Sequence, residues 1–429
     1  MKYLLIIGDG MADYPIPELN WKTPLETAAT PHLDSLAQNQ AILGMVRTIP
    51  RGVKAASDTA FLSILGCDPR KYHPGRGPLE AINLGVDLQD GEVAFRVNLV
   101  TLNENKMADY SAGHITDEEA TTLITLLQEN FSPEEILFYP GKSYRNVMVF
   151  KKPVFDWRKL ITVPPHDILD KTVTAYLPKG DGDKILLSLM ERAGKLLLNH
   201  PINKTRVDLA ENPANNIWPW GQGEKARLPL FRDRFNLEGV TVSAVDIVKG
   251  IGKAVGLEAI NVPGATGYLD TNYQGKVDAA ITALKTVDFA VLHIEAPDET
   301  SHSGETKLKT KAIIDFDRKV VGPAISILQT EFPEYRVMVM SDHITSLRQK
   351  THTPDPVPFL IAGTGIHGKS APVFSEKQAT ASRIYVKEGW KIIDLFLSNP
   401  LTYGQNNHRS GFQPRQPAPK HPAGAEASD

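Results

Sequence analysis

Three apolar segments, widely separated in the sequence, each lead into an acidic residue, and this pattern restricts the folds open to the chain. Short, continuous apolar runs are typical of strands buried on both faces of a parallel sheet. In an open α/β sheet the carboxyl ends of such strands lie along one edge, where ligands bind. We therefore expect the three acids to converge. The segments are residues 3–7, leading to Asp9, residues 289–294, leading to Asp298, and residues 337–340, leading to Asp342.

The third of these segments also brings histidines. His343 directly follows Asp342, and His352 lies a short loop further on. Carboxylate oxygen and imidazole nitrogen together suit Mn²⁺ or Zn²⁺ better than Mg²⁺, which prefers oxygen ligands alone. An Asp-His pair at a strand end also serves as a turn or capping pair, so this motif alone leaves both interpretations open.

The segment after residues 289–294 offers a second group of ligands. Pro297 argues against a helix at Glu295 and Ala296, so we expect Asp298 and His302 on the exit loop or on the first turn beyond it. Residues four apart share one face of a helix. If this turn is helical, Asp298 and His302 can face one metal ion.

Ser57 stands at the start of a predicted helix. Phe61, Ile64 and Leu65 recur at helical spacing, and Gly66 supplies the stop signal. The free N–H groups and the positive dipole end of a helix N-terminus favour an anion, such as a phosphate or a developing serine alkoxide. An ordinary serine N-cap explains the same pattern, and both interpretations stay open at this point.

Composition narrows the class of protein. A chain of 429 residues exceeds what one hydrophobic core normally supports, so we expect two domains. A formal net charge of -3 gives no sign of a nucleic-acid-binding surface, and Cys67 is the only cysteine, which excludes an intrachain disulfide. The apolar run at the N-terminus is too short for a signal peptide, and no apolar stretch reaches membrane-spanning length. We therefore expect a cytoplasmic protein without nucleic-acid or membrane partners; its oligomeric state is left open.

The order of the predicted elements indicates an α/β fold with a doubly wound, mostly parallel sheet and a smaller inserted lobe. The pattern changes between residues 78 and 205 to alternating short strands and helices, which predicts an inserted α/β or α+β domain. The larger domain is then discontinuous and comprises residues 1–77 and 206–398. Residues 216–223 are interpreted as a rigid connector between the domains. The Pro-, Gly- and Gln-rich residues 399–429 are expected to be disordered.

Three further predictions concern the C-terminal half. Residues 307–328 are predicted to form one amphipathic helix, with Asp315 and Asp317 on its solvated face. Residues 355–363 are predicted to form an edge or closing strand, because prolines stand at the entrance. Residues 379–397 are predicted to complete the fold with a helix.

Together these segments resemble the cofactor-independent (2,3-bisphosphoglycerate-independent) phosphoglycerate mutases of the archaeal type, within the alkaline phosphatase superfamily. The resemblance covers nearly everything from residue 1 to about residue 397, and the ordered set of motifs is specific although each motif is weak. The matching segments are residues 8–13, 57–60, 75–81, 109–115 and 220–223, Asp298 with His302, Asp342 with His343, and Thr351 with His352.

The resemblance implies a mechanism. Ser57 would be the nucleophile, carrying the phosphoryl group as a phosphoserine, without 2,3-bisphosphoglycerate as a cofactor. Two divalent ions are implied. Asp298, His302 and His352 would bind one ion, and Asp9, Asp342, His343 and Ser57 would bind the other.

The resemblance also implies a small phosphorylated substrate. Its phosphate and carboxylate groups would be held by four basic residues. These are His114 and Arg145 of the inserted lobe, Lys249, and Arg76 of the 75–81 segment. The inserted lobe would close over the glycerate and exclude water, so that the phosphoryl group returns to the other hydroxyl instead of being hydrolysed.

Other functions remain open. The Glu-Thr-Ser sequence between Asp298 and His302, and Ile344 after the Asp-His pair, depart from the pattern of related chains. They allow a different phosphoryl acceptor, as in a homoserine-kinase-like reaction, or a metal-dependent phosphomonoesterase. A non-enzymatic, metal-stabilised binding protein is a third hypothesis.

Overall fold

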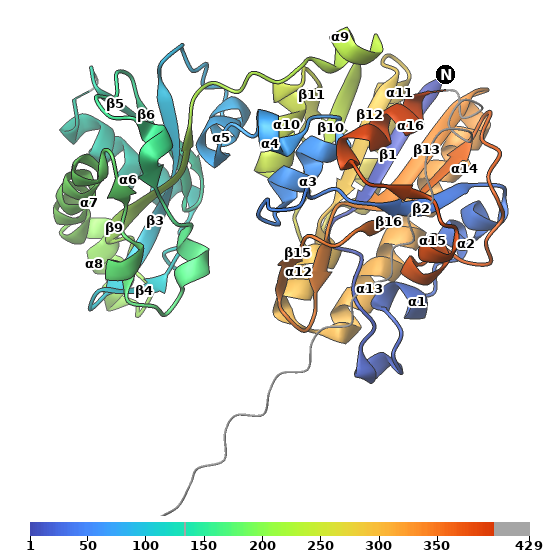
Figure 1. Cartoon of the computed structure of the whole chain (residues 1–429). Coiled ribbons are helices and arrows are strands. Elements are labelled where there is room, and N and C mark those ends of the chain that lie inside the picture. The colour runs from blue at the N-terminus through green and yellow to red at the C-terminus, as the bar shows by residue number, and fades with distance from the viewer. Residues whose placement is uncertain (133, 399–429) are drawn as a thin grey trace, which may run out of the picture.

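The computed structural model describes residues 1–132 and 134–398, which form two lobes (Figure 1). The larger lobe is built on an eight-stranded sheet with the order β11-β10-β12-β1-β13-β16-β2-β17. Neighbouring strands are parallel except where β16 pairs with β13 and β2. The strands are β1 (Lys2–Gly8), β2 (Ile42–Val46), β10 (Gly239–Val242), β11 (Glu258–Ile260), β12 (Phe289–Ile294), β13 (Tyr335–Ser341), β16 (Val357–Gly363) and β17 (Tyr385–Val386).

Strand β1 lies at the centre of the parallel part, between β12 and β13. Gly8, its last residue, pairs with Ile294 on one side and with Ser341 on the other. The three apolar segments singled out in the sequence are therefore adjacent strands that end at the same level. The residues that follow them meet at one edge of the sheet.

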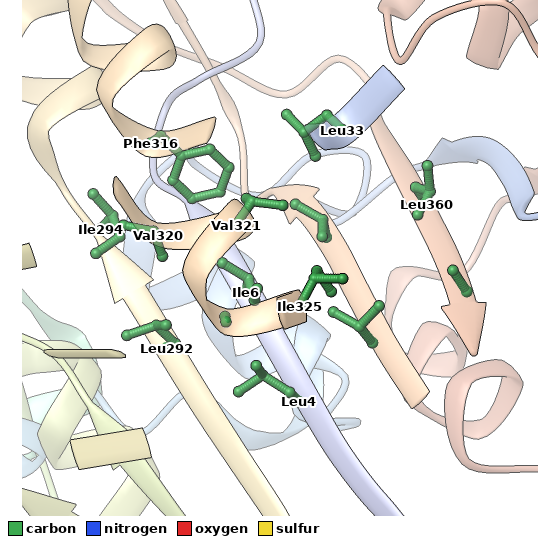
Figure 2. Close-up of a cluster of buried hydrophobic side chains, with 14 of the residues drawn as sticks. Leu4, Ile6, Leu33, Leu292, Ile294, Phe316, Val320, Val321, Ile325 and Leu360 are labelled. Atoms are coloured by element: carbon green, nitrogen blue, oxygen red, sulfur yellow. The ribbon is translucent and has the colours of Figure 1, made fainter. Parts of the chain in front are cut away.

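Helices cover both faces of this sheet because alternate residues of β1 point to opposite sides. Leu4 and Ile6 belong to the core on one face (Figure 2), whereas Leu5 and Ile7 belong to the core on the other. Burying each such side chain contributes roughly 1.5–3 kcal/mol. The first face packs against α2 (Pro31–Gln38), α11 (Tyr273–Leu284), α13 (Thr306–Phe316) and α14 (Gly322–Glu331), and the second against α3 (Ser57–Ile64), α10 (Asp246–Ala254) and α16 (Ile392–Leu397).

The smaller lobe contains a five-stranded antiparallel sheet with helices packed on it, which makes it an α+β unit. Its central strand, β3, pairs with β4, β6 and β9. Its elements are β3 (Val93–Asn103), β4 (Lys106–Asp109), β5 (Ile136–Lys142), β6 (Arg145–Phe150), β9 (Asn216–Gly223), α6 (Asp117–Asn130), α7 (Asp183–Leu198) and α8 (Pro201–Asp208).

The interpretation of residues 216–223 as a connector is wrong. They form β9, which pairs with β3 and buries Trp218 and Trp220 in the core of the smaller lobe. The sheet of this lobe therefore extends beyond residue 205, where we had placed its boundary. Pro219 and the glycines suggested a loop, but a proline is tolerated in a strand whose N–H side needs no partner.

The chain leaves the larger lobe and returns to it at one place. A side chain at Gly75 would collide with the backbone oxygen of Gln222, and one at Gly223 would collide with that of Pro74. Helix α5 (Arg76–Asn83) begins at this crossing and packs against α10 of the larger lobe as well as against β3 and β9. The two lobes are therefore joined by a pair of segments in direct contact.

Residues 355–363 do not form an edge strand. Strand β16 lies inside the sheet, antiparallel to both β13 and β2. Its pairing with β13 covers residues 359–363 and leaves out Pro358, so the missing proline N–H is tolerated there.

Two predicted helices are interrupted. The helix predicted at 307–328 contains a π-helical turn, Asp317–Val321, between α13 and α14. Asp317 is fully buried and accepts hydrogen bonds from the N–H groups of His32 and Leu33 at the start of α2, so its predicted place on a solvated face is wrong. Asp315 is also buried, and it pairs with Lys311 and Lys319.

The helix predicted at 379–397 is divided into α15 (Glu376–Ala381) and α16, with β17 and a short 3₁₀ turn between them. The prediction of disorder for 399–429 concerns residues outside the described part of the chain. Over residues 1–132 and 134–398, none of the helices is long and apolar enough to span a lipid bilayer.

Candidate metal centre

Several segments carry the predicted ligands to the edge of the sheet where β12, β1 and β13 end. Asp9 follows β1, Asp342 and His343 follow β13, and His352 lies on a short hairpin of β14 (Ile344–Ser346) and β15 (Thr351–Thr353). Helix α12 (Ala296–Ser303) follows β12 and carries Asp298 and His302.

Helix α12 corrects one local prediction. It begins at Ala296, one residue before Pro297, where we had argued against a helix. A proline in the first turn is tolerated because the N–H groups there have no partner within the helix. The helical turn places Asp298 and His302 on one face, with His302 Nε2 3.2 Å from Asp298 Oδ2.

The first group of predicted ligands is Asp298, His302 and His352. His352 Nε2 lies 3.4 Å from Asp298 Oδ1 and 3.0 Å from His302 Nε2. Two imidazole nitrogens at hydrogen-bonding distance can share only one proton between them. A divalent cation would satisfy both lone pairs at once.

The second group is Asp9, Asp342 and His343, which are all buried and whose ligand atoms lie within 4.8 Å of one another. His343 Nε2 lies 3.3 Å from Asp9 Oδ1, 3.3 Å from Asp342 Oδ2 and 3.1 Å from Ser57 Oγ. The Ser57 hydroxyl therefore lies beside His343 Nε2, the same nitrogen that faces the carboxylates of Asp9 and Asp342.

Unsatisfied oxygen atoms indicate that this second group fits a cation. Asp9 Oδ1 and Asp342 Oδ2 are buried and have no hydrogen-bond partner among residues 1–132 and 134–398, although buried polar atoms are normally satisfied. Burial, together with the neighbouring charges of Asp342 and Asp298, raises the pKa of Asp9 well above its usual range. A divalent ion would compensate the clustered negative charge and satisfy the free oxygen atoms. The mixed oxygen and nitrogen donors of both groups fit such ions.

Ser57 is the first residue of α3, but it is not the N-cap. Ala56 occupies the N-cap position in an extended conformation, so the capping interpretation of Ser57 is wrong. The Ser57 hydroxyl instead points to His343. It lies at the helix end where N–H groups favour an anion.

Basic residues pair with Asp58, the residue that follows Ser57. Asp58 is buried, and its carboxylate lies 3.3 Å from His73 Nε2 and 3.6 Å from Arg76 Nη1. Burial alone would raise the pKa of Asp58, but the charges of His73 and Arg76 bring it well below its usual range. Asp58 is therefore an ionised carboxylate that pairs with His73 and Arg76.

Arg76 also belongs to a cluster around Glu80, whose carboxylate accepts hydrogen bonds from Arg76 Nε at 3.0 Å and from Arg96 Nη1 at 2.7 Å. The charges of Arg96, Arg76 and Arg145 outweigh the effect of burial and lower the pKa of Glu80. Three guanidinium groups thus act on one carboxylate. The cluster retains positive charge that could bind an anion.

Three other residues were predicted to bind the substrate. Arg145, the first residue of β6, lies over the ring of Tyr144 at 5.1 Å. His114 is exposed on the loop after β4 and lies edge-on to the same ring. Lys249 of α10 interacts with Asp246 and Asn261.

Sequence reasoning missed three residues of this region: His293, Thr345 and Arg96. His293 Nε2 lies 3.2 Å from Asp9 Oδ2, and the Thr345 hydroxyl contacts both Asp298 Oδ1 and His343 Nδ1. A histidine inside a buried apolar strand was a usable signal for the first. Arg96 also interrupts an apolar strand, whereas nothing in the sequence pattern marks Thr345.

The fold and the site together define an α/β protein with a candidate two-metal centre at the carboxyl edge of a mostly parallel sheet. Comparison with known proteins identifies the family. The chain belongs to the 2,3-bisphosphoglycerate-independent phosphoglycerate mutases.

Several similarities support this assignment. The family model with that description matches residues 39–203. The 2,3-bisphosphoglycerate-independent phosphoglycerate mutase of Methanothrix thermoacetophila is 46% identical over 398 residues, which cover 93% of this chain and 100% of the relative. A solved structure of a Pyrococcus horikoshii protein has a TM-score of 0.78 and 33% identity, covering 92% of this chain and 96% of that one. The cofactor-independent phosphoglycerate mutase of Thermoplasma acidophilum has a TM-score of 0.61 and 26% identity, covering 92% and 99%.

Proposed function

We propose that the protein interconverts 3-phosphoglycerate and 2-phosphoglycerate without 2,3-bisphosphoglycerate, through a phosphoserine at Ser57. The observation that carries the proposal is the position of the Ser57 hydroxyl, 3.1 Å from His343 Nε2, which belongs to a buried group with Asp9 and Asp342. Family membership supports the choice of substrate.

Within this proposal, the site holds two divalent ions. One ion is bound by Asp298, His302 and His352. The other is bound by Asp9, Asp342, His343 and Ser57. Mn²⁺ or Zn²⁺ suits the mixed donors better than Mg²⁺. When bound, such ions supply positive charge that favours the serine alkoxide and offsets the charge of the phosphoryl oxygens.

The chemistry on the protein is a double transfer. Ser57 Oγ loses its proton and attacks the phosphorus atom of the substrate, and the bond from phosphorus to the glycerate oxygen breaks. That oxygen takes up a proton, which balances the proton lost by Ser57 Oγ. The second hydroxyl of the same glycerate then loses its proton and attacks the phosphoserine. The bond from phosphorus to Ser57 Oγ breaks, Oγ takes up a proton, and the isomer is released. The N–H groups at the start of α3 favour the anionic oxygens throughout.

The phosphate and carboxylate of the substrate are proposed to bind to Arg76, Arg145, Lys249 and His114. The positive charge around Glu80 supports this role for the two arginines. The smaller lobe would serve as the cover that excludes water from the phosphoserine. The relation of the larger lobe to alkaline phosphatases, and action in the cytoplasm, belong to the same proposal.

The test is an assay of 3-phosphoglycerate conversion with Mn²⁺ and without 2,3-bisphosphoglycerate. We expect the wild type to convert the substrate and to acquire a phosphoryl group on the peptide that contains Ser57, as measured by mass spectrometry. Ser57→Ala should lose both. Ser63→Ala is the matched control, because Ser63 lies on the same helix and its buried hydroxyl has no hydrogen-bond partner in the part of the chain that the structure describes.

A parallel assay with ATP and homoserine distinguishes the other acceptor. Conversion of phosphoglycerate by Ser57→Ala would contradict the role of this residue. Phosphorylation of homoserine without mutase activity would contradict the proposed substrate while leaving the metal centre in place.

A further inference from the structure

His293 is a buried polar residue that the proposed mechanism does not use. It lies in β12, pairs with Ile7 of β1, and is fully buried, with its ring edge-on to Phe61. Burying an imidazole in an apolar core costs free energy unless its nitrogen atoms find partners. Both ring nitrogens therefore need an explanation.

The first nitrogen is held by a serine. His293 Nδ1 lies 3.2 Å from Ser243 Oγ, and Ser243 Oγ accepts a hydrogen bond from the N–H group of Val245 at 2.9 Å. The serine hydroxyl can then donate its own hydrogen to Nδ1. In the neutral ring this places the remaining proton on Nε2.

The second nitrogen faces a metal ligand. His293 Nε2 lies 3.2 Å from Asp9 Oδ2, and it has no aligned hydrogen bond to any described residue. The other oxygen of the same carboxylate, Oδ1, faces His343 and likewise has no hydrogen-bond partner among the described residues. The two histidines therefore approach opposite oxygens of Asp9.

We propose that His293 is a positioning residue, which donates from Nε2 to Asp9 Oδ2 and thereby presents Oδ1 to the ion shared with Asp342 and His343. The inference rests on the two-metal centre of the proposed function. Residues that orient metal ligands in this way affect metal affinity without binding the ion themselves. Ser243 has the supporting role of fixing the proton on Nε2.

Two amide substitutions test the contact with Asp9. In His293→Gln the amide nitrogen can reach the position of Nε2, whereas in His293→Asn the shorter amide stops near Nδ1 and Ser243. Both are polar and uncharged, so they differ mainly in reach. The measurement is calorimetric titration of metal-free protein with Mn²⁺, with unfolding of the metal-free variants as a check of folding.

We expect the wild type to bind two ions. His293→Asn should lower the affinity for one of these ions by about 10–100-fold. In His293→Gln the affinity for that ion should stay within a few-fold of the wild-type value. His302→Gln identifies the other ion, because His302 belongs to the first group of ligands. Ser243→Ala should weaken the same ion as His293→Asn by a smaller factor, and it serves as the test if His293→Asn does not fold.

The role of His293 would be overturned if the Asn and Gln variants bound Mn²⁺ with equal affinity. It would also be overturned if His293→Asn lowered the affinity for the ion held by His302. A wild type that binds no Mn²⁺ would overturn the two-metal centre itself. The two failures are distinguishable because the first requires a wild type that binds both ions.

Discussion

Lys309 and Asp13 form an ion pair in which neither side chain is exposed, with Nζ 2.9 Å from Asp13 Oδ2. The ammonium also donates to the backbone oxygens of Ala12 and Thr345. Lys309 of α13 therefore ties the loop after β1, which carries Asp9, to the hairpin that carries His352. The contact therefore links two segments that carry residues of the two predicted ligand groups.

Replacing Lys309 should destabilise the protein strongly. Lys309→Met leaves the Asp13 carboxylate buried without its partner, and breaking a buried pair in this way typically costs about 3–5 kcal/mol. Denaturant unfolding of the metal-free protein measures the change. Asp13→Asn in the Lys309→Met background should recover part of the loss, since it removes the unpaired charge; additive effects of the two substitutions would contradict the pairing.

Asp317 should stabilise the folded protein through its hydrogen bonds with the start of α2. Its carboxylate accepts hydrogen bonds from the N–H groups of His32 and Leu33, whereas Thr30, at the N-cap position, makes no side-chain capping bond. Asp317→Ala should lower the free energy of unfolding by about 1–3 kcal/mol, because two N–H groups lose their acceptor. Asp317→Asn keeps one carbonyl oxygen and should lose less. An Ala variant as stable as the wild type would show that water replaces the carboxylate.

Removal of divalent ions should lower the thermal stability. The buried carboxylates of Asp9, Asp298 and Asp342 lie close together and repel one another without a cation. An ion present at 100 times its dissociation constant stabilises the folded state by about 2.7 kcal/mol. We expect a chelator to lower the melting temperature and Mn²⁺ to restore it. Ser57→Ala should keep most of this shift, because the other ligands remain, and an unchanged melting temperature after chelation would argue against the metal centre.

Glu376 should make stability fall as the pH rises towards 8. Burial raises the pKa of Glu376 to about 7, even though its carboxylate accepts hydrogen bonds from the Thr23 hydroxyl and the Asp13 N–H group. A folded-state pKa above the unfolded value of about 4.3 means that the stabilising contribution is complete below that value and is lost as the pH rises through 7.

The size of this loss is roughly 1–3 kcal/mol. Glu376→Gln keeps an acceptor for the Asp13 N–H group and cannot ionise. Its free energy of unfolding should therefore change less between pH 5 and pH 8 than that of the wild type, measured in urea at each pH. Parallel pH profiles for the two proteins would contradict the assignment.

The sequence predicted the elements whose patterns are local. The helix predicted to start at Ser57 and to stop at Gly66 has a clear period, and it matches α3. The strands leading to Asp9, Asp298 and Asp342 are continuous apolar runs, and their common edge follows from parallel pairing. The seven residues predicted as metal ligands consequently lie together, and their binding of ions stays a prediction.

Other features depend on tertiary pairing. Whether residues 357–363 lie inside the sheet is decided by their two partner strands, which a local pattern does not reveal. Residues 216–223 contain proline and glycine and look like a loop until β3 is placed beside them. The role of His293 likewise depends on the register between β12 and β1, which brings it beside the end of β1 and so to Asp9.

The contact of Gly75 and Gly223 with the opposite crossing segment means that the two ends of the smaller lobe lie side by side. Such a unit can be inserted into, or removed from, a surface turn of the larger lobe without any change to the order of the eight-stranded sheet. Its excision with a short glycine-rich joint should therefore leave a chain that still folds. This architecture lets a single insertion event add a second lobe to an existing sheet.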